Sequence, residues 1–79
     1  MTNYEKYLKT FMDKFSISEE EAVKLEYQGI DDWDSVGHMG LIAEIEDSFD
    51  IMMDTDDIID LSSFEKGKEI LAKNYNIEF

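Results

Sequence analysis

Asp34, Ser35 and Val36 stand where an acidic stretch meets the predicted start of a helix, and this position suits the binding of an anion. The first backbone N–H groups of a helix have no partner within it, and the helix dipole is positive at that end. A phosphodiester on the Ser35 hydroxyl would therefore be stabilised there. Serine and aspartate are also the common helix N-caps, so Asp34 or Ser35 fits that ordinary role as well. The three residues alone leave both interpretations open.

The rest of the chain offers little chemistry of its own. His38 is the only histidine and lies one turn after Ser35, where we expect a surface residue, or one that contacts a group attached to Ser35, rather than a catalytic acid or base. There is no cysteine, which excludes disulfides and thiolate metal sites. The aspartate-rich run 54–57 is similar to the start of a calcium loop, but Ile59 stands where that loop requires glycine. We therefore expect neither a metal site nor an enzyme.

The distribution of charge indicates the kind of partner. The formal net charge is −13, and the chain has 20 acidic residues against 7 basic ones, all of them lysine. The segment 25–64 holds twelve of the acids and no basic residue. Such a field repels nucleic acid and anionic membrane and attracts basic protein surfaces. We expect a soluble, cytoplasmic monomer without a leader or membrane segment; acidity that serves only solubility is the alternative.

The apolar pattern predicts a single all-α domain over residues 1–79, a small bundle of three long helices and one short helix. The 79 residues leave room for one domain only. Apolar residues recur at helical spacing over 4–15, after a Thr2-x-x-Glu5 capping box. A second capping box at Ser18 predicts a turn or short helix over 22–25, and 29–34 is expected to be a loop anchored by Trp33.

The later helices are predicted over 36–49, over 55–61 after an Asp54 or Thr55 cap, and from a capping box formed by Ser62 and Glu65. The last helix should turn its apolar side inward with Phe64, Gly67, Ile70 and Leu71. In the helix over 36–49 the expected apolar face is Val36, Met39, Leu41, Ile42, Ala43, Ile45 and Phe49, and the opposite stripe is Gly37, Gly40, Glu44, Asp47 and Ser48. The two glycines in its first turns cost helix stability, which suggests close approach of another group.

Three stretches together resemble the acyl carrier protein family. They are the run 32–39 (DWDSVGHM), the helix end Ile45-Glu46-Asp47-Ser48-Phe49, and the run 57–64 (DIIDLSSF). The family's hallmark is Asp-Ser-Leu at the start of its second helix, for which Asp34-Ser35-Val36 stands here. Length, acidity, order of helices and spacing agree over nearly the whole chain, so the combination is specific although each piece alone is not.

The resemblance implies a cofactor and a set of partners. A phosphopantetheinyl transferase would attach 4′-phosphopantetheine from coenzyme A to Ser35, assisted by Asp34. The thiol of this arm would carry an acyl or aminoacyl group as a thioester, which suits a chain without cysteine. Partners would be an acyl- or aminoacyl-activating ligase and acyl-transfer or synthase enzymes with basic docking surfaces. The candidate partner-binding residues are Val36, Met39, Glu44, Glu46, Asp47 and Asp50.

Differences from the family pattern indicate which kind of carrier to expect. Fatty-acid carriers commonly have acidic residues where this chain has Gly37 and Gly40, and the leucine after the serine is Val36 here. Trp33 before Asp34-Ser35, with Gly37-His38-Met39 after Val36, is more similar to stand-alone carriers that are paired with adenylating ligases in specialised pathways. A housekeeping fatty-acid carrier is the alternative within the family. The alternative from another class is an unmodified acidic helical module that binds a basic protein, which would need the charge but not Ser35.

Overall fold

The computed structural model describes residues 1–79 and contains five helices and no strand. They are α1 (Asn3–Phe15), α2 (Glu19–Ala22), α3 (Ser35–Phe49), α4 (Thr55–Asp60) and α5 (Phe64–Asn74). The all-α prediction with three long helices is confirmed. The region after Ser18 does form a helix, but over Glu19–Ala22, so the bundle has two short helices instead of one.

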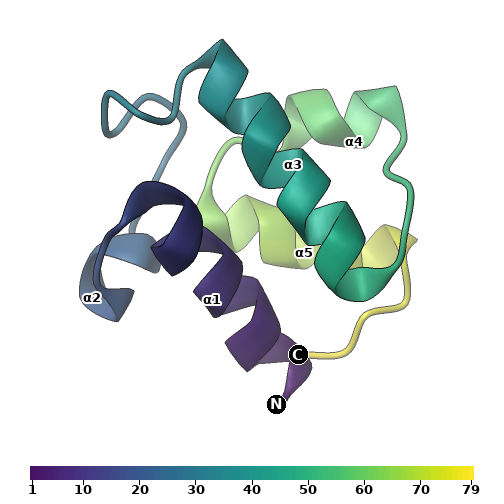
Figure 1. The fold of residues 1–79 in the computed structure, drawn as a ribbon. Coiled ribbons are helices and arrows are strands. Elements are labelled where there is room, and N and C mark those ends of the chain that lie inside the picture. Colours follow the sequence, from purple (N-terminus) through teal and green to yellow (C-terminus); the bar gives the residue numbers. More distant parts are fainter.

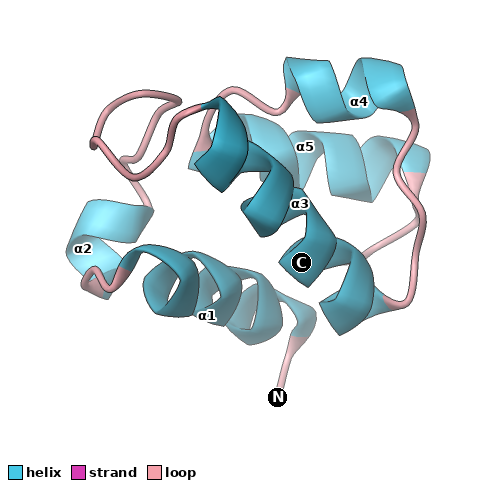
Figure 2. Ribbon diagram, turned by 45° about the horizontal axis from the view of Figure 1, so that its top comes forward, coloured by secondary structure: helices cyan, strands magenta, loops and turns pink.

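The helices pack in a crossed arrangement around one core (Figure 1). α3 crosses α1 and passes in front of α5, while α4 lies beside α5 in both views (Figures 1 and 2). The two chain ends meet at the foot of α1, where the Asn3 side chain donates a hydrogen bond of 3.0 Å to the Glu78 carbonyl. No helix has both the length and the apolar character needed to cross a membrane.

The ends of the helices follow local sequence. Thr2 and Ser18 form the two predicted capping boxes, in which each hydroxyl accepts from the backbone N–H three residues later. α5 corrects the third prediction: it begins one residue later than expected, and its cap is Ser63, whose hydroxyl accepts from the Lys66 N–H at 3.0 Å. The Ser62–Glu65 capping box was therefore wrong.

Aromatic side chains fill the centre of the core. The Tyr7 ring lies 5.0 Å from the Phe11 ring and 4.8 Å from the Phe64 ring, measured between centroids. The buried Tyr7 hydroxyl donates a 2.7 Å hydrogen bond to the Phe64 carbonyl. Burial, with a smaller effect of the Glu65 charge, raises the pKa of Tyr7 well above its ordinary value. A side chain at Gly67 would collide with the Tyr7 hydroxyl, so α5 can approach α1 closely only because this residue has no Cβ.

The segment 23–34 has no helix, which confirms the loop predicted over 29–34, and it is held in place by backbone hydrogen bonds and one anchor. Tyr27 N–H donates to the Ser62 carbonyl at 2.8 Å, and Phe64 N–H donates to the Leu25 carbonyl at 2.9 Å. The anchor is Trp33, which is fully buried and stacks on Phe15 with 5.6 Å between ring centroids. The predicted anchoring role of Trp33 is confirmed, and it fixes the loop that leads into α3.

Candidate functional site

Ser35 is the first residue of α3 and is exposed to solvent. Asp34 is the N-cap: its carboxylate accepts from the Gly37 N–H at 2.8 Å, and its carbonyl accepts from the His38 N–H at 2.7 Å. The cap therefore satisfies the N–H groups of Gly37 and His38, while those of Ser35 and Val36 have no hydrogen-bond partner within the protein. A group attached to the Ser35 hydroxyl would lie beside these amides at the positive end of a 15-residue helix.

Gly37 explains how the acidic loop can lie against the start of α3. It is buried, although the sequence placed it on the stripe opposite the apolar face. A Cβ on Gly37 would collide with the backbone carbonyl of Asp32. The close approach that the glycines suggested is therefore real at Gly37, and it brings the loop backbone against the helix. At Gly40 the neighbour is only the flexible end of the Lys14 side chain.

His38 bridges three parts of the chain. Its Nδ1 accepts a 2.9 Å hydrogen bond from the indole N–H of Trp33, and its Nε2 lies 2.7 Å from the carbonyl oxygen of Ile58 in α4. Because an indole N–H only donates and a carbonyl only accepts, the pairing requires a neutral imidazole with its proton on Nε2. Both ring nitrogens are thus occupied in structural hydrogen bonds. We expected a surface residue or one that contacts a group on Ser35, and the bridge was not predicted, because the sequence does not show that Trp33 and Ile58 lie beside His38.

An apolar cleft of about 370 Å³ opens beside Ser35, between the start of α3 and α4. Its lining comes from the loop, α3, α4 and the turn before α5, and consists of Tyr27, Ser35, His38, Met39, Ile58, Ile59, Leu61 and Ser62. The sequence singled out Ser35, His38 and Met39, and it missed the five others as site residues. Four of these five, Tyr27, Ile58, Ile59 and Leu61, are apolar or aromatic residues that the sequence alone does not distinguish from ordinary core residues, and only the fold brings them and Ser62 to Ser35.

The predicted partner-binding residues Val36 and Met39 lie on the surface next to Ser35. Their side chains are 80% and 55% exposed, and Ile59 of α4 is 71% exposed. The prediction that Val36, Met39 and Ala43 belong to the inward apolar face of α3 was wrong. Of the seven residues predicted for that face, only Leu41, Ile42 and Ile45 are buried. Exposed apolar side chains such as these are suited to contact with another protein.

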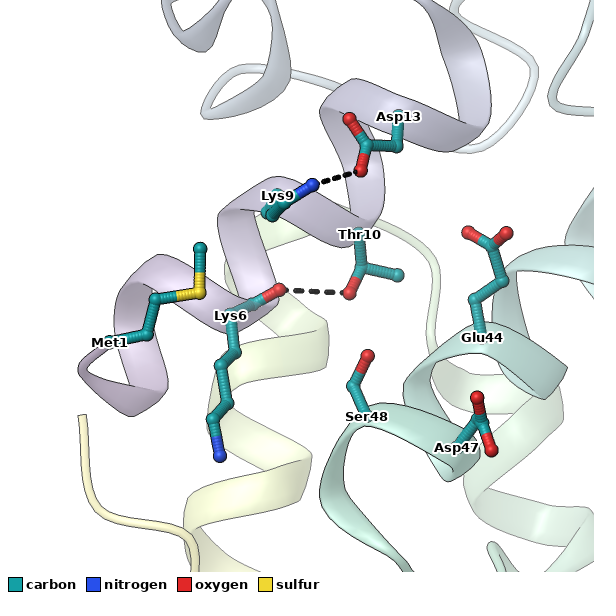
Figure 3. Close-up of a pocket in the computed structure, with 8 residues that line it drawn as sticks. All are labelled: Met1, Lys6, Lys9, Thr10, Asp13, Glu44, Asp47 and Ser48. Atoms are coloured by element: carbon teal, nitrogen blue, oxygen red, sulfur yellow. Dashed lines mark hydrogen bonds and ion pairs between the residues drawn. The ribbon is translucent and has the colours of Figure 1, made fainter.

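The four predicted acidic contacts do not share one environment. Glu44 and Asp47 are exposed on α3 and line a polar groove across from Lys6, Lys9 and Thr10 of α1 (Figure 3). Asp50 is the exposed residue that ends α3 in a left-handed conformation, with φ 54°. Glu46 instead accepts a 2.9 Å hydrogen bond from the Met53 N–H, which ties the following loop to α3. Glu46 is therefore also part of the framework, whereas the other three are open to a partner.

The aspartate-rich start of α4 is engaged within the protein. The Tyr75 hydroxyl donates to the Asp57 carboxylate at 2.7 Å and accepts from the Asp54 N–H at 2.8 Å, while the Asn74 amide donates to Asp57 at 3.0 Å. Desolvation raises the pKa of Tyr75, and the neighbouring Asp57 and Asp54 charges act in the same direction. These bonds give Asp57 a structural role in joining α4 to the end of α5.

Comparisons of the chain with protein families, with curated proteins and with solved structures found no match. The site at Ser35 combines an exposed hydroxyl at a helix start, a cleft lined mostly by apolar side chains, and the exposed apolar side chains of Val36 and Met39 on the same helix.

Proposed function

We propose that this protein is an acyl carrier protein that bears 4′-phosphopantetheine on Ser35 and carries acyl or aminoacyl groups as thioesters between enzymes. The observation that carries the proposal is the setting of Ser35, an exposed hydroxyl at the start of α3 beside two backbone N–H groups without an internal partner. A phosphodiester there gains favourable interactions with the helix terminus, and a long arm is free to swing into solvent.

In this proposal the protein positions the arm and the partner enzymes do the chemistry. The cofactor supplies the thiol, which the chain itself lacks because it has no cysteine. Asp34 holds the first turn of α3 through the Gly37 N–H and keeps one carboxylate oxygen available to the transferase and its metal. His38 takes no part in the chemistry, since both of its ring nitrogens are engaged.

The surface around Ser35 supports partners with an apolar centre and a basic rim. Val36, Met39 and Ile59 are exposed, Asp47 lies further along α3, and Asp50 caps the C-terminal end of that helix. Charge complementarity speeds encounter and selects the partner, and burial of the apolar side chains adds contact energy. The partners we propose are a phosphopantetheinyl transferase, an acyl- or aminoacyl-activating ligase, and acyl-transfer or synthase enzymes, all in the cytoplasm.

Intact mass spectrometry after incubation with coenzyme A, magnesium and a broad-specificity phosphopantetheinyl transferase tests the proposal. The wild type and the Ser62→Ala variant should each gain one phosphopantetheine, whereas Ser35→Ala should gain none. Ser62 is a suitable control because it is also a serine and lines the same cleft as Ser35. If the wild type gains no mass with several transferases, the carrier role is rejected, and an unmodified acidic module that binds a basic protein becomes the better explanation of this surface.

A further inference from the structure

The side chain of His38 forms the wall between the cleft beside Ser35 and the aromatic core. His38 is one of the residues that line the cleft. The Nδ1 edge of its ring faces the indole of Trp33: the two rings are nearly coplanar, with 14° between planes and 6.1 Å between centroids, and the 2.9 Å hydrogen bond joins their edges. Trp33 is fully buried and does not line the cleft. A group entering the cleft from Ser35 therefore meets His38 before it can reach the core.

Two hydrogen bonds and a neighbouring ring hold this wall in place. The Trp33 indole fixes one ring nitrogen of His38, and the Ile58 carbonyl fixes the other. Tyr27 packs edge-on against the His38 ring at 5.5 Å. Rotation of the imidazole would leave a buried indole N–H without an acceptor and break the tie between α3 and α4, so the wall should resist displacement by a chain pushing into it.

The lining determines which group the cleft can accept. Five of its eight residues are hydrophobic, the nitrogens of His38 are already paired, and the remaining polar side-chain groups are the hydroxyls of Ser35, Ser62 and the partly exposed Tyr27. An apolar group buried there gains the free energy of leaving water, whereas a charged group would lose its hydration without a charged partner in the lining. The occupant that suits the cleft is a short aliphatic group.

We infer that His38 is the residue that limits the length of the group held at Ser35: a short aliphatic chain lies in the cleft, and a longer one stays in solvent because the imidazole closes the way to Trp33. The inference rests on the proposed function for its biological meaning, in which the group is the acyl cargo. It assigns His38 a positioning role that selects the cargo by size, without contact with the reacting thioester.

The test uses the absence of cysteine from the chain. In Ser35→Cys the single thiolate attacks an alkyl methanethiosulfonate, forms a mixed disulfide with the alkylthio group and releases methanesulfinate. Methyl, butyl and octyl groups are attached in this way to Ser35→Cys and to the double variants with His38→Ala and His38→Phe. Two readouts are followed: the emission of Trp33, the only tryptophan, and the melting temperature.

With His38 present, the melting temperature should rise from the methyl to the butyl adduct and rise no further with octyl, and Trp33 emission should be the same in all three. In the His38→Ala background the octyl adduct should shift Trp33 emission and melt higher than the butyl adduct. His38→Phe keeps a ring in the wall but loses both hydrogen bonds, and its octyl adduct should leave the emission at the methyl value. If His38→Ala does not fold, His38→Val takes its place, since it also removes the ring.

A shift of Trp33 emission by octyl when His38 is present would overturn the inference, and so would an octyl adduct that causes no shift after the ring is removed. The cysteine adducts form without a transferase. Failure of enzymatic modification at Ser35 would therefore reject the proposed function while leaving the result for the His38 wall readable.

Discussion

Replacing Gly37 and Gly40 separately by alanine should change stability in opposite directions, although both substitutions lie in the first turns of α3. Alanine is better than glycine by about 1 kcal/mol within a helix, because glycine loses more backbone freedom on folding. This gain is common to both positions. The difference between them comes from what the new methyl group meets.

At Gly40 a Cβ would lie 2.6 Å from the Nζ of Lys14, which is the free end of a flexible side chain. The lysine can move aside at little cost, so Gly40→Ala should stabilise the protein by about 0.5–1 kcal/mol. At Gly37 the neighbour is the backbone carbonyl of Asp32, and the loop that carries it is anchored by the buried Trp33. Overpacking against such a rigid group costs about 1–3 kcal/mol or more, which exceeds the gain in helix propensity.

We expect Gly37→Ala to be less stable than the wild type by about 1–2 kcal/mol, and the two variants to differ by about 1.5–3 kcal/mol. In a domain of this size each kcal/mol corresponds to about 4–8 °C in melting temperature. Urea unfolding followed by Trp33 fluorescence and by circular dichroism measures both free energies. Equal stabilisation by the two alanines would refute the reasoning, because the loop could not then lie against Gly37.

Three further predictions concern caps, buried phenol and charge. Ser63→Ala should lower the free energy of unfolding by about 1 kcal/mol through loss of the α5 cap, while Ser62→Ala should have little effect. Urea unfolding measures both, and a similar loss of stability in the two variants would contradict the observed cap. Since the pKa of Tyr7 is raised in the folded state, its contribution to stability is complete below about pH 10, the usual pKa of the unfolded phenol, and is lost as pH rises toward the folded pKa. Between pH 8 and 11 the urea midpoint of Tyr7→Phe should therefore fall less steeply with pH than that of the wild type. At pH 8 the variant should be less stable than the wild type, because it loses the hydrogen bond to the Phe64 carbonyl. Parallel curves of midpoint against pH would argue against a buried phenol. Magnesium or sodium chloride should raise the melting temperature of this chain of net charge −13 by screening its self-repulsion, and a melting temperature unchanged by both salts would show that repulsion is unimportant.

The sequence by itself was sufficient for features that depend on neighbours along the chain. The spacing of apolar residues predicted α1, α3, α4 and α5 to within a few residues, and the capping boxes at Thr2 and Ser18 formed as expected. The acidic middle and the place of Ser35 at a helix start are likewise local facts. These predictions held because hydrogen bonds and side-chain periodicity within a helix act over three or four residues.

The tertiary structure decided which faces of α3 are covered and what surrounds Ser35. Helical periodicity told which residues share a face, but not that Val36 and Met39 would be left exposed or that Gly37 would be buried under the Asp32 carbonyl. The His38 bridge and the apolar cleft join residues from a loop, two helices and a turn. Such sites depend on contacts between segments far apart in sequence, and no periodic pattern within one helix encodes the partner that another segment will bring.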